Sequence, residues 1–332
     1  MQIKINDKII GQNTPVYVVA EIGFNHGGDK QLAVQMIEGA AQAGASAVKF
    51  QTFKANKLVL EKEDHFKIIQ KAELFFDDYK ELSEIARLNG LDFFSTPFDI
   101  ESVDILEDIG VAVYKIASMD ITNFHLLSYI AKTKKPVILS TGMAVLSEIA
   151  EAVDVLKNEG LSEIILLHCI SNYPASIEDT NLINISYLRN TFSLLTGYSD
   201  HTIGNIAPLT AGILGASVIE KHFTIDKNLP GPDHQMSSDI DELKQLINDL
   251  NQAKKCLGDT INSSRPDIEN AKAFRRGIYA SQFIPKGTTI NKNMIKLVRP
   301  EKDLSPKQLD IIINRLATKD INKEEAICFE NI

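Results

Sequence analysis

The sequence predicts an α/β chain: a (β/α)8 barrel of the TIM type followed by a small β-rich domain. From residue 16 to residue 257, short apolar runs rich in β-branched residues alternate with amphipathic stretches, and the alternation repeats eight times. Eight such units in about 250 residues are what a parallel barrel requires. After Gly258 the pattern ends, and short strands between turn residues follow. A doubly wound open sheet is the rival fold, but no Gly-x-Gly-x-x-Gly motif follows the first strand.

Eight apolar runs are the candidate barrel strands. In chain order they are residues 16–22, 47–51, 92–95, 113–116, 136–140, 163–169, 195–199 and 218–222. Between them, Asp78 followed by Glu81 resembles a capping box, and Asp99 places an acid in a first helical turn. Apolar residues at helical spacing, Leu146, Ile149, Val153 and Leu156, precede Gly160. The helix signals and the eight strand-like runs therefore favour the same fold, a (β/α)8 barrel.

The end of the chain predicts a separate small module. Residues 277–283, 288–290 and 295–298 have the composition of short strands, and Pro285-Lys286-Gly287 marks a turn between them. The stretch before them is polar and contains Pro266. We therefore expect a barrel over residues 1–258, a linker over 259–274 and a small domain over 275–332.

The composition is that of an ordinary globular protein and excludes several classes of function. A chain of 332 residues that is 44% hydrophobic can bury a full core. A net charge of −9 argues against nucleic acid as a partner. The charged start and the lack of any apolar run near ~20 residues predict a cytoplasmic protein with no membrane partner. Cys169, Cys256 and Cys328 lack Cys-x-x-Cys spacing, so neither a disulfide framework nor a cysteine zinc site is expected.

Polar side chains end every candidate strand. The carboxyl ends of barrel strands meet at one rim, where the active sites of such barrels lie. Lys49 and Lys115 end the second and fourth strands, and serine and threonine hydroxyls end their neighbours. Together with loop amides, these groups can bind the phosphate and the carboxylate of one small molecule. A single lysine near a strand end is more often a surface charge, so the hypothesis rests on the set.

Two histidines predict a metal site at the same rim. His201 and His222 end the seventh and eighth strands, which are neighbours in a barrel, and could offer imidazole nitrogens to one divalent ion. Only two evident protein ligands leave positions for water and substrate, which favours Mn²⁺ or Mg²⁺ over a closed zinc centre. A purely structural role for buried histidines is the alternative.

Two other histidines lie in loops at this rim. His234 belongs to the turn-rich segment Pro230-Gly231-Pro232-Asp233-His234, which leaves the eighth strand and can lean over the barrel mouth. His26 belongs to Asn25-His26-Gly27-Gly28, after the first strand. The alternative for His234 is a turn without a functional role. The alternative for His26 is a capped loop whose glycines serve only the tight backbone.

Eight short motifs resemble the sialic acid (nonulosonic acid) synthases. They are Glu21-Ile22-Gly23-Phe24-Asn25-His26, Val48-Lys49-Phe50-Gln51, Ser95-Thr96-Pro97-Phe98, Tyr114-Lys115-Ile116-Ala117-Ser118, Ser140-Thr141-Gly142-Met143, Leu167-His168-Cys169, Tyr198-Ser199-Asp200-His201-Thr202 and Glu220-Lys221-His222-Phe223-Thr224. The family includes synthases for neuraminic, legionaminic and pseudaminic acids and related spore-coat polysaccharide proteins. Because the motifs run in order through nearly the whole chain, the series is more specific than any single match.

The resemblance implies a domain plan and a set of site residues. Residues 275–332 would form an antifreeze-like (SAF) domain, and the protein would be a homodimer in which this domain covers the partner's barrel. Phosphoenolpyruvate would be held by Lys49, Thr96, Lys115, Ser118 and Ser140, and the divalent metal by His201 and His222. The sugar would face Glu21, Tyr173 and Asp233, with Arg299 reaching in from the other subunit.

The sequence departs from the family pattern at a few of these positions. A further residue on the phosphate side falls on Ser171 by strict register, whereas an asparagine stands one place later at Asn172, and both are candidates. Asp120 stands where many members have glutamate, which shortens a possible sugar contact by one methylene. The residues after Arg299-Pro300 lack the expected glycine-containing turn, which affects the placement of the cross-subunit contact.

The implied reaction is a metal-dependent transfer that forms a carbon–carbon bond. Phosphoenolpyruvate would condense with N-acetylmannosamine or a related 2,4-diacetamido sugar, with Glu21, His201 and His222 as the catalytic set. The products would be phosphate and a nonulosonic acid of the N-acetylneuraminate or legionaminate type. Another phosphoenolpyruvate-dependent aldol-type synthase and a non-catalytic polysaccharide-assembly protein are the alternatives. The acceptor stays open between N-acetylmannosamine, its 6-phosphate and a 2,4-diacetamido trideoxy sugar.

Overall fold

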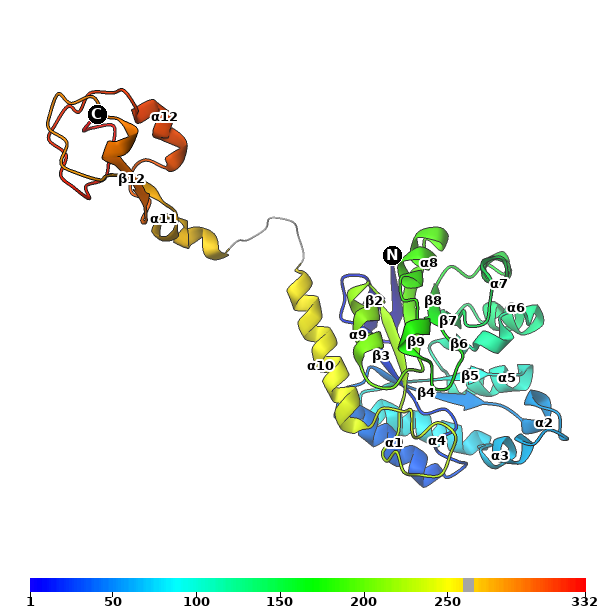
Figure 1. Cartoon of the computed structure of the whole chain (residues 1–332). Helices are drawn as coiled ribbons and strands as arrows, with labels where there is room; N and C mark the ends of the chain where they lie inside the picture. Colours follow the sequence, from blue (N-terminus) through cyan, green and yellow to red (C-terminus); the bar gives the residue numbers. More distant parts are fainter. Residues whose placement is uncertain (259–265) are drawn as a thin grey trace. The chain divides into compact units, whose positions relative to one another are not determined.

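The computed structural model describes residues 1–258 and 266–332 and divides into two compact units, Met1–Gly258 and Asp259–Ile332. Each unit has its own hydrophobic core (Figure 1). Residues 259–265 of the predicted linker lie outside the described residues. Its remainder forms a 3-10 helix, Pro266–Asn270, and the short helix α11 (Ala271–Phe274).

Eight parallel strands form a nearly closed barrel in the first unit. They are β3 (Tyr17–Glu21), β4 (Ala47–Thr52), β5 (Asp92–Pro97), β6 (Tyr114–Ile116), β7 (Val137–Ser140), β8 (Ile164–Cys169), β9 (Leu195–Asp200) and β10 (Val218–His222). The hydrogen-bonded order is β5-β4-β3-β10-β9-β8-β7-β6, and β5 and β6 at its two ends lie beside each other. All eight strands are those expected from the sequence, and the TIM-type fold is confirmed.

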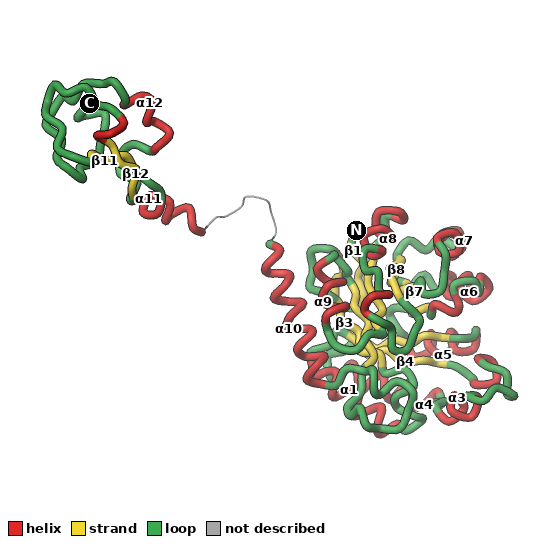
Figure 2. The backbone as a smooth tube through the Cα atoms, viewed as in Figure 1, coloured by secondary structure: helices red, strands yellow, loops and turns green. Residues whose placement is uncertain are grey.

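Helices surround these strands, as Figure 2 shows by colour. They are α1 (Lys30–Ala43), α4 (Phe76–Leu88), α5 (Ile100–Ile109), α6 (Phe124–Lys132), α7 (Leu146–Asn158), α8 (Asn184–Phe192), α9 (Ile206–Ile213) and α10 (Ile240–Leu257), with the short α2 (Ala55–Leu58) and α3 (Phe66–Lys71) before α4. Asp99 caps α5 by accepting the Ser102 N–H. The capping box expected at Asp78 and Glu81 was wrong: Asp78 is the third residue of α4, and its carboxylate accepts the Phe75 N–H.

Successive side chains of a barrel strand point alternately to two hydrophobic clusters, one under the helices and one inside the barrel. On β3, Val18 and Ala20 pack outward under the helices, whereas Tyr17 and Val19 belong to the cluster inside the barrel. The same period places Glu21 in the inward series, at the carboxyl end of the strand. Each strand therefore directs its last inward side chains into the barrel mouth.

An N-terminal hairpin closes the opposite end of the barrel. Strands β1 (Gln2–Ile5) and β2 (Lys8–Gly11) pair antiparallel. Ile3, Ile5 and Ile10 belong to the interior cluster, together with residues from the amino ends of the barrel strands. The hairpin was not among the expected strands, although Ile3 and Ile5 have strand spacing.

The second unit is a small β-containing domain. It contains β11 (Gly277–Ala280), β12 (Ile295–Val298) and α12 (Leu309–Ile312) around a core that includes Ile278, Ile284 and Ile321. The strand expected at residues 288–290 is not a ladder strand, and Thr289 makes only an isolated bridge to Leu316. None of the helices within 1–258 and 266–332 has the length and apolar character needed to cross a bilayer.

Candidate active site

A cavity of about 510 Å³ opens at the carboxyl ends of the barrel strands. Its floor is polar and consists of the inward side chains of the strands, among them Glu21, Lys49, Lys115 and Glu220. Part of its wall is apolar and comes from the loops and from α2 and α3. The sequence-based expectation that strand-end residues meet at one rim is therefore realised in the structure.

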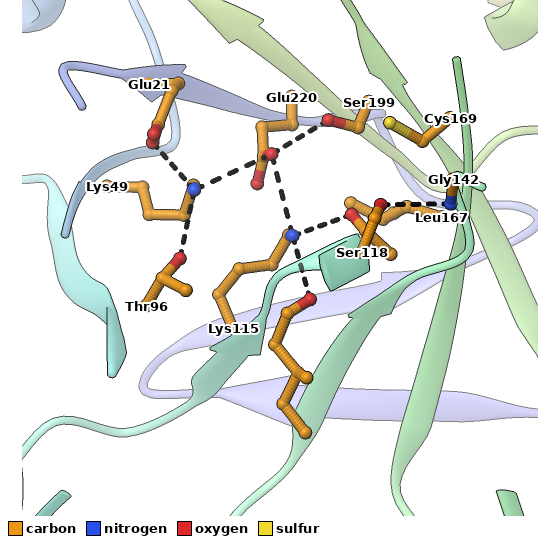
Figure 3. Close-up of polar contacts among 12 residues, drawn as sticks. Glu21, Lys49, Thr96, Lys115, Ser118, Gly142, Leu167, Cys169, Ser199 and Glu220 are labelled. Atoms are coloured by element: carbon orange, nitrogen blue, oxygen red, sulfur yellow. Dashed lines mark hydrogen bonds and ion pairs between the residues drawn. The ribbon is translucent and has the colours of Figure 1, made fainter. Parts of the chain in front are cut away.

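Lys49 lies between two carboxylates in the cavity floor. Its Nζ is 2.9 Å from Glu21 Oε2, 3.7 Å from Glu220 Oε1 and 3.1 Å from Thr96 Oγ1 (Figure 3). Burial disfavours the ammonium, but Glu21 and Glu220 outweigh burial and raise the pKa of Lys49. Lys49 is therefore a fixed positive charge. Burial also raises the pKa of the Glu21 carboxyl, although Lys49 opposes this shift.

Lys115 is the second buried ammonium of the floor. Its Nζ lies 2.6 Å from Ser140 Oγ, 3.1 Å from the Ile116 carbonyl oxygen and 3.8 Å from Glu220 Oε1. Burial lowers the pKa of Lys115 against the opposing effect of Glu220. Glu220 thus links both lysines, and it also accepts a hydrogen bond from Ser199 Oγ at 2.9 Å. The two lysines offset the effect of burial and lower the pKa of Glu220.

A small polar niche lies beside Lys115, where three loops meet. Ser118 Oγ accepts the Gly142 N–H at 3.0 Å. A Cβ on Gly142 would lie 2.4 Å from Ser171 Oγ and 2.8 Å from Ser118 Oγ. Only glycine therefore lets the backbone approach both hydroxyls. Two hydroxyls next to an ammonium are suited to an anion.

The two candidate metal-binding histidines face the same cavity. Their ring centroids are 5.4 Å apart, near enough for both imidazoles to reach one ion. His201 Nδ1 lies 2.7 Å from the Ile170 carbonyl oxygen and donates to it, which leaves Nε2 free as a ligand. His222 Nδ1 is buried without a hydrogen-bond partner among the described residues. Burial lowers the pKa of His222, which keeps the imidazole neutral, as a ligand must be.

These observations fit a divalent ion held by few protein ligands. Within residues 1–258 and 266–332, no group of three or more histidine, cysteine, aspartate or glutamate side chains is placed to hold a metal. His201 and His222 would therefore leave most coordination positions to water and substrate.

The expected sugar-side residues fall into two groups. Tyr173 and Asp233 line the cavity, and the Tyr173 ring packs on His201 with centroids 4.1 Å apart. Asp120 is buried outside the lining, where its carboxylate accepts a hydrogen bond from Asn123. Of the two candidates for the phosphate side, Asn172 is exposed outside the lining, whereas its neighbour Ser171 lines the cavity. Arg299 belongs to the second unit, where its guanidinium lies over the Phe274 ring.

Several cavity residues were not among the sequence-based candidates. Glu220 links the two lysines, and Gln51 Nε2 donates to Glu21 Oε1 at 2.9 Å. The sequence could have predicted both. Glu220 stands two residues before His222, and Gln51 stands two residues after Lys49, so each shares the inward face of its strand with a candidate residue. Leu58, Val59 and Ile69 of the apolar wall carried no sequence signal, because residues 54–76 have no clear periodicity.

Comparison with known proteins places the chain in a family. Residues 36–262 match the NeuB family, and residues 275–332 match the SAF domain. The chain belongs to the NeuB family. Together with the relatives below, these matches confirm the resemblance to nonulosonic acid synthases with an SAF domain.

Several relatives of this NeuB-family chain are synthases of nonulosonic acids. N,N'-diacetyllegionaminic acid synthase of Campylobacter jejuni is 41% identical over 93% of this chain and 98% of its own length. Pseudaminic acid synthase of the same species is 35% identical over 94% of this chain and 95% of its own length. The crystal structure of N-acetylneuraminic acid (sialic acid) synthetase from Leptospira borgpetersenii, in complex with citrate, is 39% identical with a TM-score of 0.79. It covers 81% of this chain and 95% of that one.

Proposed function

We propose that this chain condenses phosphoenolpyruvate with an unphosphorylated 2,4-diacetamido aldehyde sugar to give a legionaminate-type nonulosonic acid and phosphate. N-acetylmannosamine is the alternative acceptor. The observation that carries the proposal is the meeting, in one cavity, of two buried ammonium groups and two imidazoles: Lys49 and Lys115 with His201 and His222. The ammonium groups can neutralise a phosphate and a carboxylate, and the imidazoles can hold a metal ion that polarises an aldehyde.

Phosphoenolpyruvate would occupy the cationic floor. Lys49 and Lys115 would neutralise its phosphate and carboxylate, and the hydroxyls of Thr96, Ser118 and Ser140 would orient its oxygens. The niche at Gly142, with Ser171, would accept one of the two anionic groups. Burial of the floor supports the assignment, because exclusion of water strengthens each of these contacts.

The proposed reaction has two stages, formation of a carbon–carbon bond and release of phosphate. C3 of phosphoenolpyruvate attacks the aldehyde carbon of the open-chain sugar, a carbon–carbon bond forms, and the aldehyde oxygen takes a proton. Water adds at C2 and loses a proton, after which the bond between C2 and the phosphate oxygen breaks and releases phosphate. Glu21, whose pKa is raised by burial, would hold or release a proton beside Lys49. A divalent ion bound by His201 and His222, Mn²⁺ or Mg²⁺, would supply Lewis-acid polarisation of the aldehyde.

The lining of the cavity supports an acylated and unphosphorylated acceptor. Lys49 and Lys115 are its only ammonium or guanidinium groups among the described residues, and the first substrate would use both. A phosphate on the acceptor would therefore lack a cation in this unit. The apolar wall of Leu58, Val59 and Ile69 would instead bury the methyl groups of acetamido substituents.

The proposed assembly is a homodimer in the cytoplasm. Each SAF domain would cover the partner's barrel and bring Arg299 to the acceptor sugar, as the family resemblance implies. The exposed apolar side chains around the barrel mouth, such as Met143 and Ile206, support a partner at this end of the barrel.

The test uses the full chain stripped of metal. It is incubated with phosphoenolpyruvate and each candidate acceptor, with and without Mn²⁺, and mass spectrometry follows the products alongside released phosphate. We expect a nonulosonic acid with the 2,4-diacetamido sugar only when metal is added. If product forms from N-acetylmannosamine 6-phosphate instead, the proposal of an unphosphorylated acceptor is refuted. Bound phosphoenolpyruvate with no product from any acceptor would refute the synthase assignment.

A further inference from the structure

The loop between β10 and α10 carries Asp233 into the cavity. The Asp233 carboxylate lines the cavity wall, and its Oδ2 lies 3.8 Å from His222 Nδ1. The loop is rich in turn residues, Pro230-Gly231-Pro232, and has no helix or strand of its own between Phe223 and Asp239. The position of Asp233 therefore depends on what holds this loop.

His234, the next residue, does not line the cavity and is 1% exposed. Its Nδ1 lies 2.7 Å from Thr224 Oγ1 at the start of the loop. A Cβ on Gly231 would lie 2.8 Å from His234 Cδ2, so the turn packs directly on the imidazole. The loop is thus folded around the His234 ring.

A second buried connection reaches Asp233 itself. Asn25 Nδ2, on the loop after β3, donates to the Phe223 carbonyl oxygen and to Ser237 Oγ, both at 2.9 Å. Ser237 Oγ in turn donates to the Asp233 carbonyl oxygen at 2.7 Å. Asn25 and Ser237 are both fully buried. The backbone of Asp233 is therefore held by Ser237 and Asn25, while its carboxylate lines the cavity.

We propose that His234 is a positioning residue that acts on the acceptor sugar through Asp233. Loss of the His234 ring removes the hydrogen bond to Thr224 Oγ1, and the turn that carries Asp233 loses the ring on which it packs. None of the polar partners of Lys49 and Lys115 belongs to this loop, so binding of phosphoenolpyruvate at its proposed site should be unaffected. The inference rests on the proposed function, because it takes the cavity beside His222 as the acceptor site.

The kinetic test is a double-mutant cycle in the full-length, metal-loaded protein. His234→Phe keeps an aromatic ring, larger than imidazole, but cannot hydrogen-bond, whereas His234→Asn is smaller and places a polar group near the Nδ1 position. We expect His234→Phe to raise the KM for the acceptor about tenfold, with the KM for phosphoenolpyruvate unchanged, and His234→Asn to recover most of the loss. In an Asp233→Ala background, His234→Phe should add nothing further. A full effect in that background, or equal effects on both substrates, would overturn the inference.

A second measurement does not depend on the identity of the acceptor. Hydrogen exchange of the amides at residues 230–238 should become faster in His234→Phe, while β10 keeps its protection. The matched control is His125→Phe, the same change at an exposed site on α6, which should leave exchange and both KM values unchanged. Unchanged exchange in His234→Phe would overturn the inference. If the wild-type protein makes no product but hydrogen exchange does increase in His234→Phe, the proposed function is refuted, whereas the role of His234 in holding the loop is supported.

Discussion

At the scale of single residues, Gly142 gives the sharpest prediction about the first substrate. Gly142→Ala places a methyl group 2.4 Å from Ser171 Oγ and 2.8 Å from Ser118 Oγ, so one or both hydroxyls must move. Loss of two hydrogen bonds to an anion predicts a KM for phosphoenolpyruvate raised by about 100-fold, with a much smaller change for the acceptor. Steady-state kinetics of the two substrates measures the difference.

The control for Gly142→Ala is Val145→Ala, an exposed position on the same loop, where neither KM should change. If Gly142→Ala leaves the KM for phosphoenolpyruvate within twofold of wild type, the niche at Ser118 and Ser171 does not bind this substrate.

His26 predicts a pH dependence of stability. Burial lowers its pKa from the ordinary 6.5 to about 4, because the ring accepts the Gly28 N–H and packs on Phe50 away from water. Between these two pH values the unfolded chain binds the proton and the folded chain does not. Stability therefore rises with pH through this window, by up to about 1.4 kcal/mol per pH unit, and is lost as the pH falls towards 4.

His26→Asn isolates this contribution, because the amide oxygen can still accept the Gly28 N–H but does not titrate. Urea unfolding at several pH values should give a shallower rise between pH 4 and 6.5 than in wild type. His125→Asn, at an exposed histidine, should leave the slope unchanged. Identical slopes for His26→Asn and wild type would contradict the assignment of a neutral buried imidazole.

The residues of the site were largely predictable because strand geometry repeats. Each apolar run ends in polar side chains, and the two-residue period decides which of them face the barrel interior. Lys49 and Lys115 followed from that rule. The hydrogen bond from the Gly142 N–H to Ser118 Oγ did not follow from it, because loop conformation sets where the two residues lie.

At the scale of elements, the N-terminal hairpin β1–β2 is a stability element of the barrel. Ile5 is fully buried in the interior cluster, whereas Ile9 on the paired strand is 52% exposed. Ile5→Ala should lower the free energy of unfolding by about 2–5 kcal/mol, because it leaves a cavity at the closed end of the barrel. Ile9→Ala should cost less than about 0.5 kcal/mol. Denaturant unfolding of both variants measures the difference, and equal losses would show that the hairpin does not close the barrel.

The hairpin and the strands of the barrel differ in how their pattern could be recognised. The barrel strands are buried on both faces and stand out as continuous apolar runs. The first strand of the hairpin alternates Ile3 and Ile5 with polar residues, and this short pattern is easily taken for a charged terminus. Helices α2 and α3 were unpredictable for another reason: each has six residues or fewer, too short for a helical period to show.

At the scale of the whole molecule, the proposed exchange of SAF domains predicts complementation between two inactive variants. Lys115→Met removes an ammonium from the barrel floor, and Arg299→Ala alters the SAF domain alone. Each homodimer should be inactive or nearly so. After the two are mixed under conditions in which subunits exchange, one site of each heterodimer combines an intact barrel with an intact Arg299 from the partner. Random pairing should then restore about a quarter of wild-type activity.

A matched control decides whether the sites are shared between subunits. Lys49 and Lys115 lie in the same barrel floor, where both approach Glu220, so Lys49→Met mixed with Lys115→Met can never produce an intact site. That mixture should stay inactive at every mixing ratio. Activity in the Lys115→Met and Arg299→Ala mixture alone means that Arg299 acts across subunits. If instead the Arg299→Ala homodimer keeps full activity, the acceptor does not use this arginine, and the SAF domain must contribute through other residues or through assembly alone.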